Sequence, residues 1–365
     1  MVRRSTLVVV FFFLIVGVII GFNAFLQNRP PLMLTLAADP SVQRWASALV
    51  QAFNARGVTL SSGVRVQWRL DATVTDINVW QGRSGWTSDN HPNAWIAGAG
   101  WLASNVPSSL PFVRVEPSLA VSPLVWGGFE SRVRLLTRDE AAPLDWQAVQ
   151  SAAAQERWSA LGAPTDWGFV NVGISWPRSS AAGVNALASM LATYTGSEAL
   201  SGSTFADDNF RGWFAPLRQA MRGSERFGEP PPNVMAVRGA VVAAVSIAPE
   251  FEWLAQIANF TSQDRLVLAY PAVNVPLDFP LSLWQDSATT DDMRSAVRAL
   301  ADFILSEAGQ AITLQAGLRP INRAPSASDQ LFAQGQPYGI LLTWQPGQTV
   351  RADRSVYEQL FRLMD

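Results

Sequence analysis

The sequence predicts an α/β protein of two lobes, preceded by one transmembrane helix. Its 365 residues exceed one ordinary domain and suffice for two lobes of roughly 150 residues each. Short apolar runs alternate along the chain with stretches whose apolar residues recur at helical spacing, which is typical of parallel α/β layering. An uncharged apolar run also stands at the front of the chain.

The front run predicts a single-pass membrane anchor. It extends from Leu7 to Leu26 behind Arg3 and Arg4, close to the roughly 20 residues that a helix needs to cross a bilayer. Because arginines beside such a helix stay in the cytoplasm, the folded part is expected on the extracytoplasmic side of the cell membrane. The run is longer than that of a signal peptide and lacks a good cleavage site, which favours an uncleaved anchor, and cleavage stays open.

The first lobe is expected to begin with a strand and a helix. Residues 32–37 form a short apolar run, and apolar residues between Val42 and Phe53 recur at helical spacing. Residues 64–70 then alternate between apolar and polar side chains, as a half-buried strand does. Two further strands are predicted over residues 93–97 and 120–126.

A similar series of elements predicts the second lobe and a return to the first. After Gly127 and Gly128 we expect the following elements: a helix over 146–154, a strand over 168–175, a long helix over 181–194, a strand over 240–247, a helix over 250–256, a strand over 266–271, and an amphipathic helix over 291–307 that ends at Gly309. The predicted boundaries are 1–31 for the anchor and linker, 32–125 and 266–323 for lobe 1, 126–265 for lobe 2, and 324–365 for a C-terminal extension packed on lobe 1.

The composition excludes most catalytic chemistry. The 27 basic residues are all arginine, Cys is absent and the single histidine is His91. The chain therefore has no Schiff-base lysine, no thiolate nucleophile and no histidine cluster for a metal, and we expect no cofactor and no enzyme activity. A net charge of −2 gives no basic footprint for nucleic acid.

Glycoside hydrolysis is the one enzyme class left open, because it needs only two carboxylates. Acid pairs occur at 207–208 and 291–292, but each pair stands at the start of a predicted helix. Negative charge at that position complements the helix dipole, so capping explains both pairs without catalysis.

A series of motifs follows one another along most of the chain after residue 32. They are residues 34–54, Pro92-Asn93-Ala94-Trp95-Ile96 with Trp101, residues 120–125, Trp176-Pro177-Arg178-Ser179-Ser180 with residues 181–187, Tyr270-Pro271, residues 277–280, residues 301–310, and Gly317-Leu318-Arg319-Pro320. In this order they resemble the type II periplasmic solute-binding superfamily, particularly its molybdate-binding-like branch, and the binding domain found upstream of von Willebrand factor type A modules in some bacterial surface proteins. The resemblance implies two α/β lobes with a ligand between them.

In such a fold the ligand is expected where strand ends meet helix N-termini, because free backbone N–H groups there favour an anion or a polar oxygen. The serines are equally well explained as helix caps, and the threonines as residues that satisfy their own loop. An aspartate near the first helix would repel a bare oxyanion such as molybdate unless it points away. The predicted ligand-binding residues are Asp39, Ser41, Thr73, Thr75, Trp95, Trp176, Arg178, Ser179, Ser180 and Ser246.

The leading interpretation is an extracytoplasmic protein that captures a small polar or anionic molecule between its lobes for ABC-type uptake. We expect a monomer whose partners are the ligand, the membrane and a transporter permease. The alternative is a ligand-free binding or scaffold module of an adhesive or sensory cell-surface assembly. A polar-lined gap between the lobes would favour the first interpretation, and a flat or apolar-filled gap the second.

Overall fold

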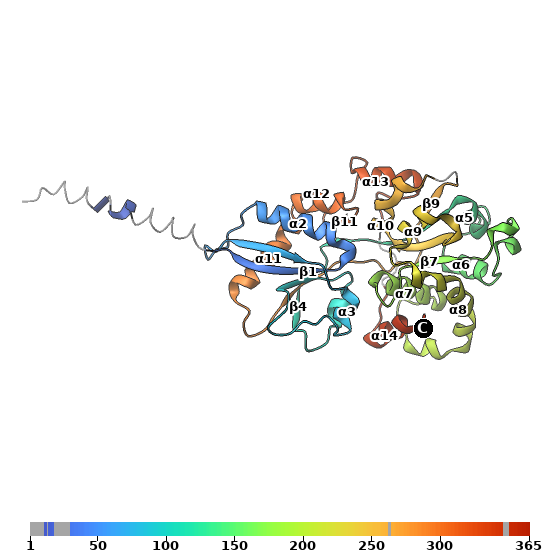
Figure 1. The fold of residues 1–365 in the computed structure, drawn as a ribbon, viewed down its shortest axis with the longest axis horizontal. Helices are drawn as coiled ribbons and strands as arrows, with labels where there is room; N and C mark the ends of the chain where they lie inside the picture. Colours follow the sequence, from blue (N-terminus) through green and yellow to red (C-terminus); the bar gives the residue numbers. More distant parts are fainter. Residues whose placement is uncertain (1–10, 13, 18–29, 262–263, 346–349) are drawn as a thin grey trace, which may run out of the picture.

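Two lobes lie side by side along the long axis of the molecule (Figure 1). The structure is a computed structural model that describes residues 11–12, 14–17, 30–261, 264–345 and 350–365. Most of the predicted anchor, Leu7 to Leu26, lies outside the described residues. Within the described ranges, every helix is too short or too polar to reach across a bilayer.

Lobe 1 is built on a mixed five-stranded sheet with the strand order β2-β1-β3-β10-β4. The first three of these strands run parallel, and β10 pairs antiparallel with both β3 and β4. The strands are β1 (Leu32–Ala38), β2 (Val66–Asp71), β3 (Ala94–Ile96), β10 (Leu281–Trp284) and β4 (Phe112–Glu116). The helices are η1 (Pro40–Val42), α2 (Gln43–Ala55), α3 (Asp76–Trp80), α4 (Gly100–Ser104), α11 (Asp291–Leu305) and α12 (Glu307–Gln315).

The first helix packs as its apolar spacing predicts. Trp45, Leu49 and Phe53 recur on one face of α2, and each is at most 2% exposed. The indole Nε1 of Trp45 donates a hydrogen bond of 3.1 Å to Thr313 Oγ1 on α12. A buried indole needs such a partner, so this bond fixes α12 against α2 and the sheet below them.

Lobe 2 is built on a four-stranded sheet with the order β7-β8-β6-β9. The helix predicted over 250–256 is found with those bounds, and the long apolar helix begins at Ala181 as expected. The strands are β7 (Val172–Ile174), β8 (Val245–Pro249), β6 (Leu124–Phe129) and β9 (Leu266–Ala269). The helices are α5 (Glu130–Thr137), α6 (Trp146–Ala153), η2 (Trp158–Leu161), η3 (Thr165–Trp167), α7 (Ala181–Thr195), η4 (Gly202–Ala206), α8 (Asp208–Met221), η5 (Arg222–Arg226), α9 (Pro231–Arg238), η6 (Gly239–Val241), α10 (Glu250–Gln256) and η7 (Ile257–Asn259).

Two segments that cross between the lobes are tied to each other by backbone bonds. Ser122 and Leu277 exchange both N–H···O bonds, at 2.8 and 2.9 Å. Asn274 adds a side-chain clamp, because its Oδ1 accepts from Leu124 N at 2.9 Å while its Nδ2 donates to Leu124 O at 2.7 Å. The paired crossings fix the point about which the lobes can move relative to one another.

The strand Leu266–Ala269 lies in lobe 2 rather than in lobe 1. It pairs antiparallel with β6, which itself begins at Leu124, before the predicted boundary at residue 126. The chain crosses back only between β9 and β10. Apolar periodicity identifies a strand but not its neighbour, which is why the sequence placed this strand in the wrong sheet.

The turn near Gly309 also differs from the predicted helix end. One helix stops at Leu305, and Ser306 caps a second helix by accepting from Gly309 N at 3.4 Å. A Cβ at position 309 would lie 2.3 Å from Phe303 O and 2.4 Å from Ile304 O. Glycine is therefore required for the close approach of two helices at a corner, and it does not terminate the first one.

The chain after residue 319 contacts both lobes instead of lobe 1 alone. Helix α13 (Gln330–Gly335), followed by η8 (Gln336–Tyr338), packs between α10 of lobe 2 and α12 of lobe 1. Helix α14 (Arg354–Arg362) packs on α7 and η4 of lobe 2, on the opposite side of the molecule from α13 (Figure 1). A short pair of strands, β5 (Ala120–Val121) and β11 (Arg319–Pro320), precedes this extension near the crossing.

Residues 350–365, which we call the C-terminal bridge, also reach lobe 1 through aromatic contacts. Tyr357 stacks on Trp101 of α4, with ring centroids 4.3 Å apart and planes inclined by 10°. Phe361 meets Trp80 of α3 edge-on at 5.8 Å. Because the same helix packs on α7, the bridge connects the two lobes outside the crossing segments.

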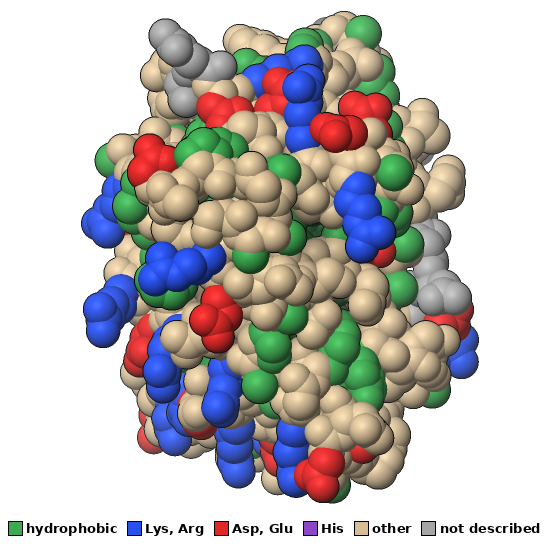
Figure 2. All heavy atoms as spheres, turned by 90° about the vertical axis from the view of Figure 1, so that its right-hand side faces the viewer, with side chains coloured by type: hydrophobic (Ala, Val, Ile, Leu, Met, Phe, Trp, Pro, Cys, Tyr) green, Lys and Arg blue, Asp and Glu red, His purple; other side chains and the backbone are tan. Residues whose placement is uncertain are grey.

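The end of lobe 2 has a surface of mixed charge. Figure 2 shows arginine and acidic side chains interspersed over this end, with several arginines toward its lower edge in the view. Two apolar residues, Val237 and Val241, are 83% and 84% exposed. A surface of mixed sign gives no strong local field that would attract a nucleic acid.

Candidate functional site

The two lobes touch where the carboxyl end of one sheet meets the start of a helix from the other lobe. Gly98 follows β3 in lobe 1, and Ala181 is the first residue of α7 in lobe 2. A Cβ built on Gly98 would lie 3.7 Å from the Ala181 Cβ, so the lobes are in van der Waals range there. We call the residues around this contact, namely Asp39, Asp76, Gly98 and Ala181, the interlobe site.

Asp39 joins the loops after the first two strands of lobe 1. Its Oδ1 accepts from Ser41 N at 2.9 Å, and its Oδ2 accepts from Asp76 N at 3.0 Å. The sequence favours a helix cap or a ligand contact at this position. The structure shows the cap, and the same carboxylate also holds the start of α3.

Asp76 is a buried carboxyl that organises the next two loops. It is 1% exposed and accepts from Trp95 Nε1 at 2.9 Å and from Gly98 N. Burial, assisted by the negative charge of Asp39, raises the pKa of Asp76 well above its ordinary value, although both hydrogen bonds oppose that shift. The Trp95 ring, predicted to face the cleft, is itself 1% exposed, so its indole nitrogen holds Asp76.

Glu252 brings a third carboxyl from lobe 2. It lies in α10, is 8% exposed, and burial raises its pKa to about 8. The second cause of that shift is the negative charge of Asp39, which belongs to lobe 1.

A hydrogen bond also crosses between the lobes beside this site. Trp101 Nε1 on α4 donates to Asn185 Oδ1 on α7 at 2.8 Å. Asn185 in turn donates through Nδ2 to the carbonyls of Val275 and Pro276, at 3.1 and 3.0 Å. The amide is fully buried, so this junction fastens lobe 1, lobe 2 and a crossing segment together.

Neutralising Glu252 is expected to stabilise the fold at high pH. Its carboxyl has a pKa of about 8 in the folded chain, against an ordinary value of 4.5, so stability falls as pH rises through that window. The Glu252→Gln variant should match the wild type near pH 4 and exceed it at pH 9 by on the order of a few kcal/mol, since one pKa unit is about 1.4 kcal/mol. Urea denaturation at both pH values measures the difference, and superimposable curves at pH 9 would contradict it.

Four predicted binding residues lie in or beside loops whose polar groups form hydrogen bonds within the same loop. Thr73 is exposed, and its N and Oγ1 both donate to Asp71 Oδ1. Ser41 is exposed within η1, and Ser179 Oγ donates back to Trp176 O at 3.2 Å. Thr75 precedes α3, where its carbonyl accepts from the helix and its side chain makes no capping bond.

The other predicted residues occupy different environments. Ser180 precedes α7 and is half-buried, with no capping bond from its side chain. Trp176 is half-buried against the core, and Arg178 is exposed and paired with Asp365 of the C-terminal bridge. Ser246 is 0% exposed within β8, where its hydroxyl occupies the space that a Cβ on Gly173 would need, so it lies in the interior of lobe 2.

Asp76 and Glu252 were not predicted. Asp76 directly follows the predicted Thr75, but α3 is only five residues long and has no periodicity that would mark a helix start. Glu252 lies in a correctly predicted helix, where charged residues are usually exposed. A carboxylate in the loop after a strand was the one available signal for Asp76.

The acid pairs that kept glycoside hydrolysis open as an enzyme class lie on the surface. Asp207 caps α8 by accepting from Asn209 N, while Asp208 is 94% exposed beside Arg211. Asp291 is 99% exposed and pairs with Arg294. Both pairs thus lie at helix starts, where negative charge complements the helix dipole. Within the described ranges, no group of three His, Cys or acidic residues is arranged to hold a metal.

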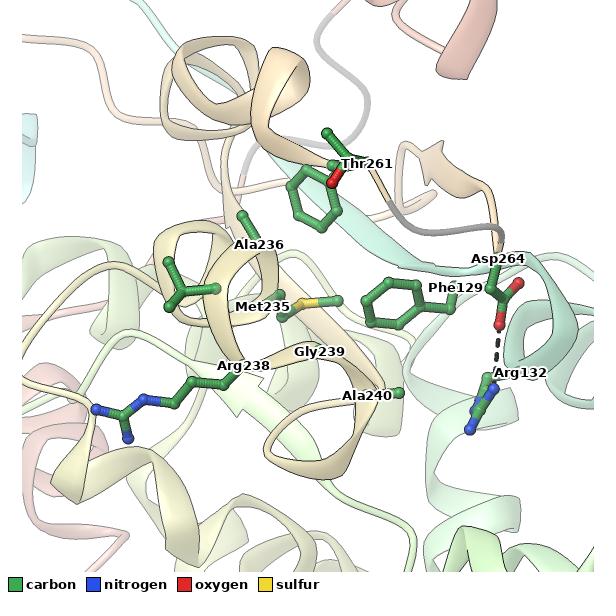
Figure 3. A pocket seen from close by; sticks show the side chains of 11 residues that line it. Phe129, Arg132, Met235, Ala236, Arg238, Gly239, Ala240, Thr261 and Asp264 are labelled. Atoms are coloured by element: carbon green, nitrogen blue, oxygen red, sulfur yellow. Dashed lines mark hydrogen bonds and ion pairs between the residues drawn. The ribbon is translucent and has the colours of Figure 1, made fainter.

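A separate hollow of about 500 Å³ opens on lobe 2 (Figure 3). Phe129 and Met235 line it, and Arg132 and Asp264 form an ion pair of 3.0 Å at its edge. All of its lining residues belong to lobe 2, so it is distinct from the interlobe site.

Solved structures with the same two-lobed arrangement include a Streptococcus pneumoniae solute-binding protein in complex with the blood group A-trisaccharide. It is 11% identical, with a TM-score of 0.59 over 91% of this chain and 94% of that one. An ABC transporter solute-binding protein from Agrobacterium radiobacter K84 in complex with ribitol is 11% identical, with a TM-score of 0.58 over 92% and 95%. The sulfate-binding protein of Mycobacterium tuberculosis H37Rv is 16% identical, with a TM-score of 0.50 over 86% and 93%. At these identities the likeness shows a shared fold.

A comparison with curated proteins finds no match. The family model described as bacterial extracellular solute-binding protein matches residues 34–319, which include both sheets and the crossing segments. Members of such a family are solute-binding proteins. The chain therefore belongs to the bacterial extracellular solute-binding protein family.

Proposed function

We propose that the chain captures a small polar molecule at the interlobe site and delivers it to an ABC-type permease. The observation that carries this proposal is the buried carboxyl group of Asp76 at the Gly98–Ala181 contact between the lobes. An interface evolved only for packing would fill such a gap with apolar side chains, since buried carboxyls cost stability. The ligands named for similar structures, among them ribitol and a trisaccharide, are also small and polar.

The start of α7 offers the complementary donors. This helix has fifteen residues, and Ser180 at its N-cap makes no capping bond. Its first backbone N–H groups and the Ser180 hydroxyl are therefore available to an oxygen atom of the ligand. Of the predicted residues we keep Asp39 and Ser180 at this site, and we add Asp76.

Capture would proceed by closure of the lobes about the paired crossing segments. Ligand that contacts both lobes binds the closed form more tightly than the open form, so it shifts the population toward closure. The aromatic side chains Trp101 and Trp80, which already lie at the lobe junction, would change environment during this motion.

We also propose that residues 7–26 hold the protein at the outer face of the cell membrane as an uncleaved anchor. This proposal is supported by the uncharged apolar run behind Arg3 and Arg4. Fractionation of cells followed by carbonate washing tests it, because an anchored protein stays with the membrane pellet and a cleaved one is released. The order of motifs further supports descent from the molybdate-binding-like branch.

A ligand-free scaffold module is the second candidate. The resemblance to domains found upstream of von Willebrand factor type A modules supports it. The C-terminal bridge favours it as well, because a helix that joins both lobes restrains the motion that capture requires.

Native mass spectrometry of the protein as purified separates these two functions. A capturing protein is expected to retain a small molecule whose removal by partial unfolding and refolding changes the tryptophan fluorescence, and whose return restores it. A protein that carries no added mass and whose fluorescence is insensitive to a cell metabolite extract would contradict capture and favour the scaffold.

A further inference from the structure

A smaller hollow, of about 230 Å³, lies between lobe 1 and the C-terminal bridge. Lobe 1 contributes Trp80 at the end of α3 and Arg83 in the turn that follows, and the bridge contributes one side of α14. The volume is below the roughly 300–1,000 Å³ of sites for drug-sized ligands, so the hollow suits a molecule of only a few non-hydrogen atoms. Its lining residues differ from those of the interlobe site.

The lining of this hollow carries an excess of positive charge. Arg354, Glu358 and Arg362 recur at helical spacing on one side of α14, and Arg83 lines the hollow from lobe 1. Three guanidinium groups and one carboxylate give the lining a net charge of +2. Like charges gathered around a small space repel one another, so an ion of opposite sign is favoured there.

Two of these arginines are unpaired. Among the described residues, neither Arg83 nor Arg362 takes part in an ion pair. The backbone N–H of Arg83 donates to Asn78 O at 2.7 Å, which fixes the turn that carries this side chain. Each guanidinium therefore has donors to offer to an oxyanion.

Arg354 is held in place beside them. Its Nε donates to Glu358 Oε1 at 2.9 Å, and its Nη1 donates to Asn105 O of lobe 1 at 2.6 Å. The guanidinium carbon also lies 5.6 Å from the ring centroid of Trp80. These contacts orient the guanidinium group before any ligand arrives, which lowers the entropy cost of binding.

The buried tryptophan of the hollow adds a donor. Trp80 is 2% exposed and its side chain lines the hollow, while its Nε1 is buried without a hydrogen-bond partner among the described residues. A buried N–H group without an acceptor is uncommon in native proteins and calls for an explanation. An acceptor oxygen would suit both this indole and the arginines around it.

We propose that the hollow binds a small oxyanion with two negative charges, of the phosphate or sulfate type, which holds lobe 1 to the C-terminal bridge. Planar guanidinium groups bind such ions through paired hydrogen bonds, and here they come from both sides of the hollow. Because α14 also packs on α7 of lobe 2, the bound ion restrains separation of the lobes. The site is independent of solute capture, so it stands whether or not the interlobe site binds a ligand.

Calorimetric titration of the full chain with inorganic phosphate tests this inference, and sodium chloride at equal ionic strength is the reference. We expect saturable binding of phosphate and none of chloride. The Arg83→Gln and Arg362→Gln variants should each bind phosphate about tenfold more weakly, as is typical when one charge-assisted hydrogen bond is lost. Glu358→Gln should bind phosphate more tightly, because it removes the negative charge of the lining.

Arg218→Gln is the matched control. Arg218 is an exposed residue of α8 in lobe 2, and within the described ranges it too takes part in no ion pair. This variant loses the same charge as Arg83→Gln and should bind phosphate like the wild type. If Arg83→Gln and Arg362→Gln bind phosphate as tightly as Arg218→Gln does, the hollow holds an adventitious ion only and the inference is overturned.

Hydrogen–deuterium exchange locates the bound ion. We expect phosphate to slow exchange in residues 76–83 and 354–362 of the wild type, and to leave both segments unchanged in Arg83→Gln. Phosphate and sulfate also stabilise folded proteins in general, because they are excluded from the protein surface. Slowing that is spread evenly over the chain and is equal in the wild type and the variant would be this general effect, and it would refute the site.

Discussion

Replacing Arg319 by methionine is expected to destabilise the protein by about 3–5 kcal/mol, because it leaves a buried carboxylate without its cation. Arg319 is 5% exposed and Glu250 is 0% exposed. The guanidinium donates to both carboxylate oxygens at 2.6 Å, and it also donates to Leu342 O at 3.0 Å. Burial raises the pKa of Glu250, and Arg319 opposes that shift, so its removal favours protonation of Glu250.

The matched control for this substitution is Arg294→Met. Arg294 forms a surface pair with Asp291, in which the two side chains are 44% and 99% exposed. Such pairs contribute about 0–1 kcal/mol. Chemical denaturation measures both variants, and a loss at position 319 no larger than that at position 294 would refute the role of the buried pair.

The Tyr357→Ala variant is expected to lose about 3–5 kcal/mol and to release the lobes from each other. The ring is 4% exposed and stacks on Trp101, so its removal leaves a large cavity at the lobe junction. The burial that raises the pKa of this tyrosine to about 12 reflects the same enclosure. We expect a lower melting temperature and, in small-angle X-ray scattering without ligand, a larger radius of gyration.

Glu358→Ala is the control for the C-terminal bridge. It changes the adjacent residue of α14, whose side chain is 43% exposed and pairs with Arg354 at the surface. This variant should cost less than about 1 kcal/mol and leave the scattering profile unchanged. If Tyr357→Ala melts earlier but scatters like the wild type, the ring supports local packing only and the lobes are held by other contacts.

Local patterns predicted the individual elements better than their partners. The apolar stripe of α2 and the bounds of α10 follow from periodicity, which depends on residues near in sequence. The position of β9 beside β6 depends on a pairing between strands about 140 residues apart, and no local pattern encodes it. The C-terminal bridge was assigned to one lobe for the same reason, since its contacts with Trp101 and α7 are tertiary.

The sequence predicted where the candidate site lies, but not what each side chain there contacts. The expectation that strand ends meet helix starts located Asp39 and Ser180, because topology alone fixes that meeting point. Whether a side chain there faces a ligand or its own loop depends on rotamers and burial. Thr73 hydrogen-bonds to Asp71, and Ser246 lies in the interior of lobe 2, whereas Glu252 is buried on a helix whose sequence gives no sign of it.

The absence of a side chain at Gly98 sets how closely the two lobes can approach at the Gly98–Ala181 contact. A methyl group there would lie 2.8 Å from Asp76 Oδ2 and 3.7 Å from Ala181, so the facing walls tolerate nothing larger than what they carry. A bulkier residue at position 98 would therefore hold the two lobes farther apart at this contact. At the proposed interlobe site, we expect such a residue to speed ligand release, so the size of this one backbone position would help to set the residence time.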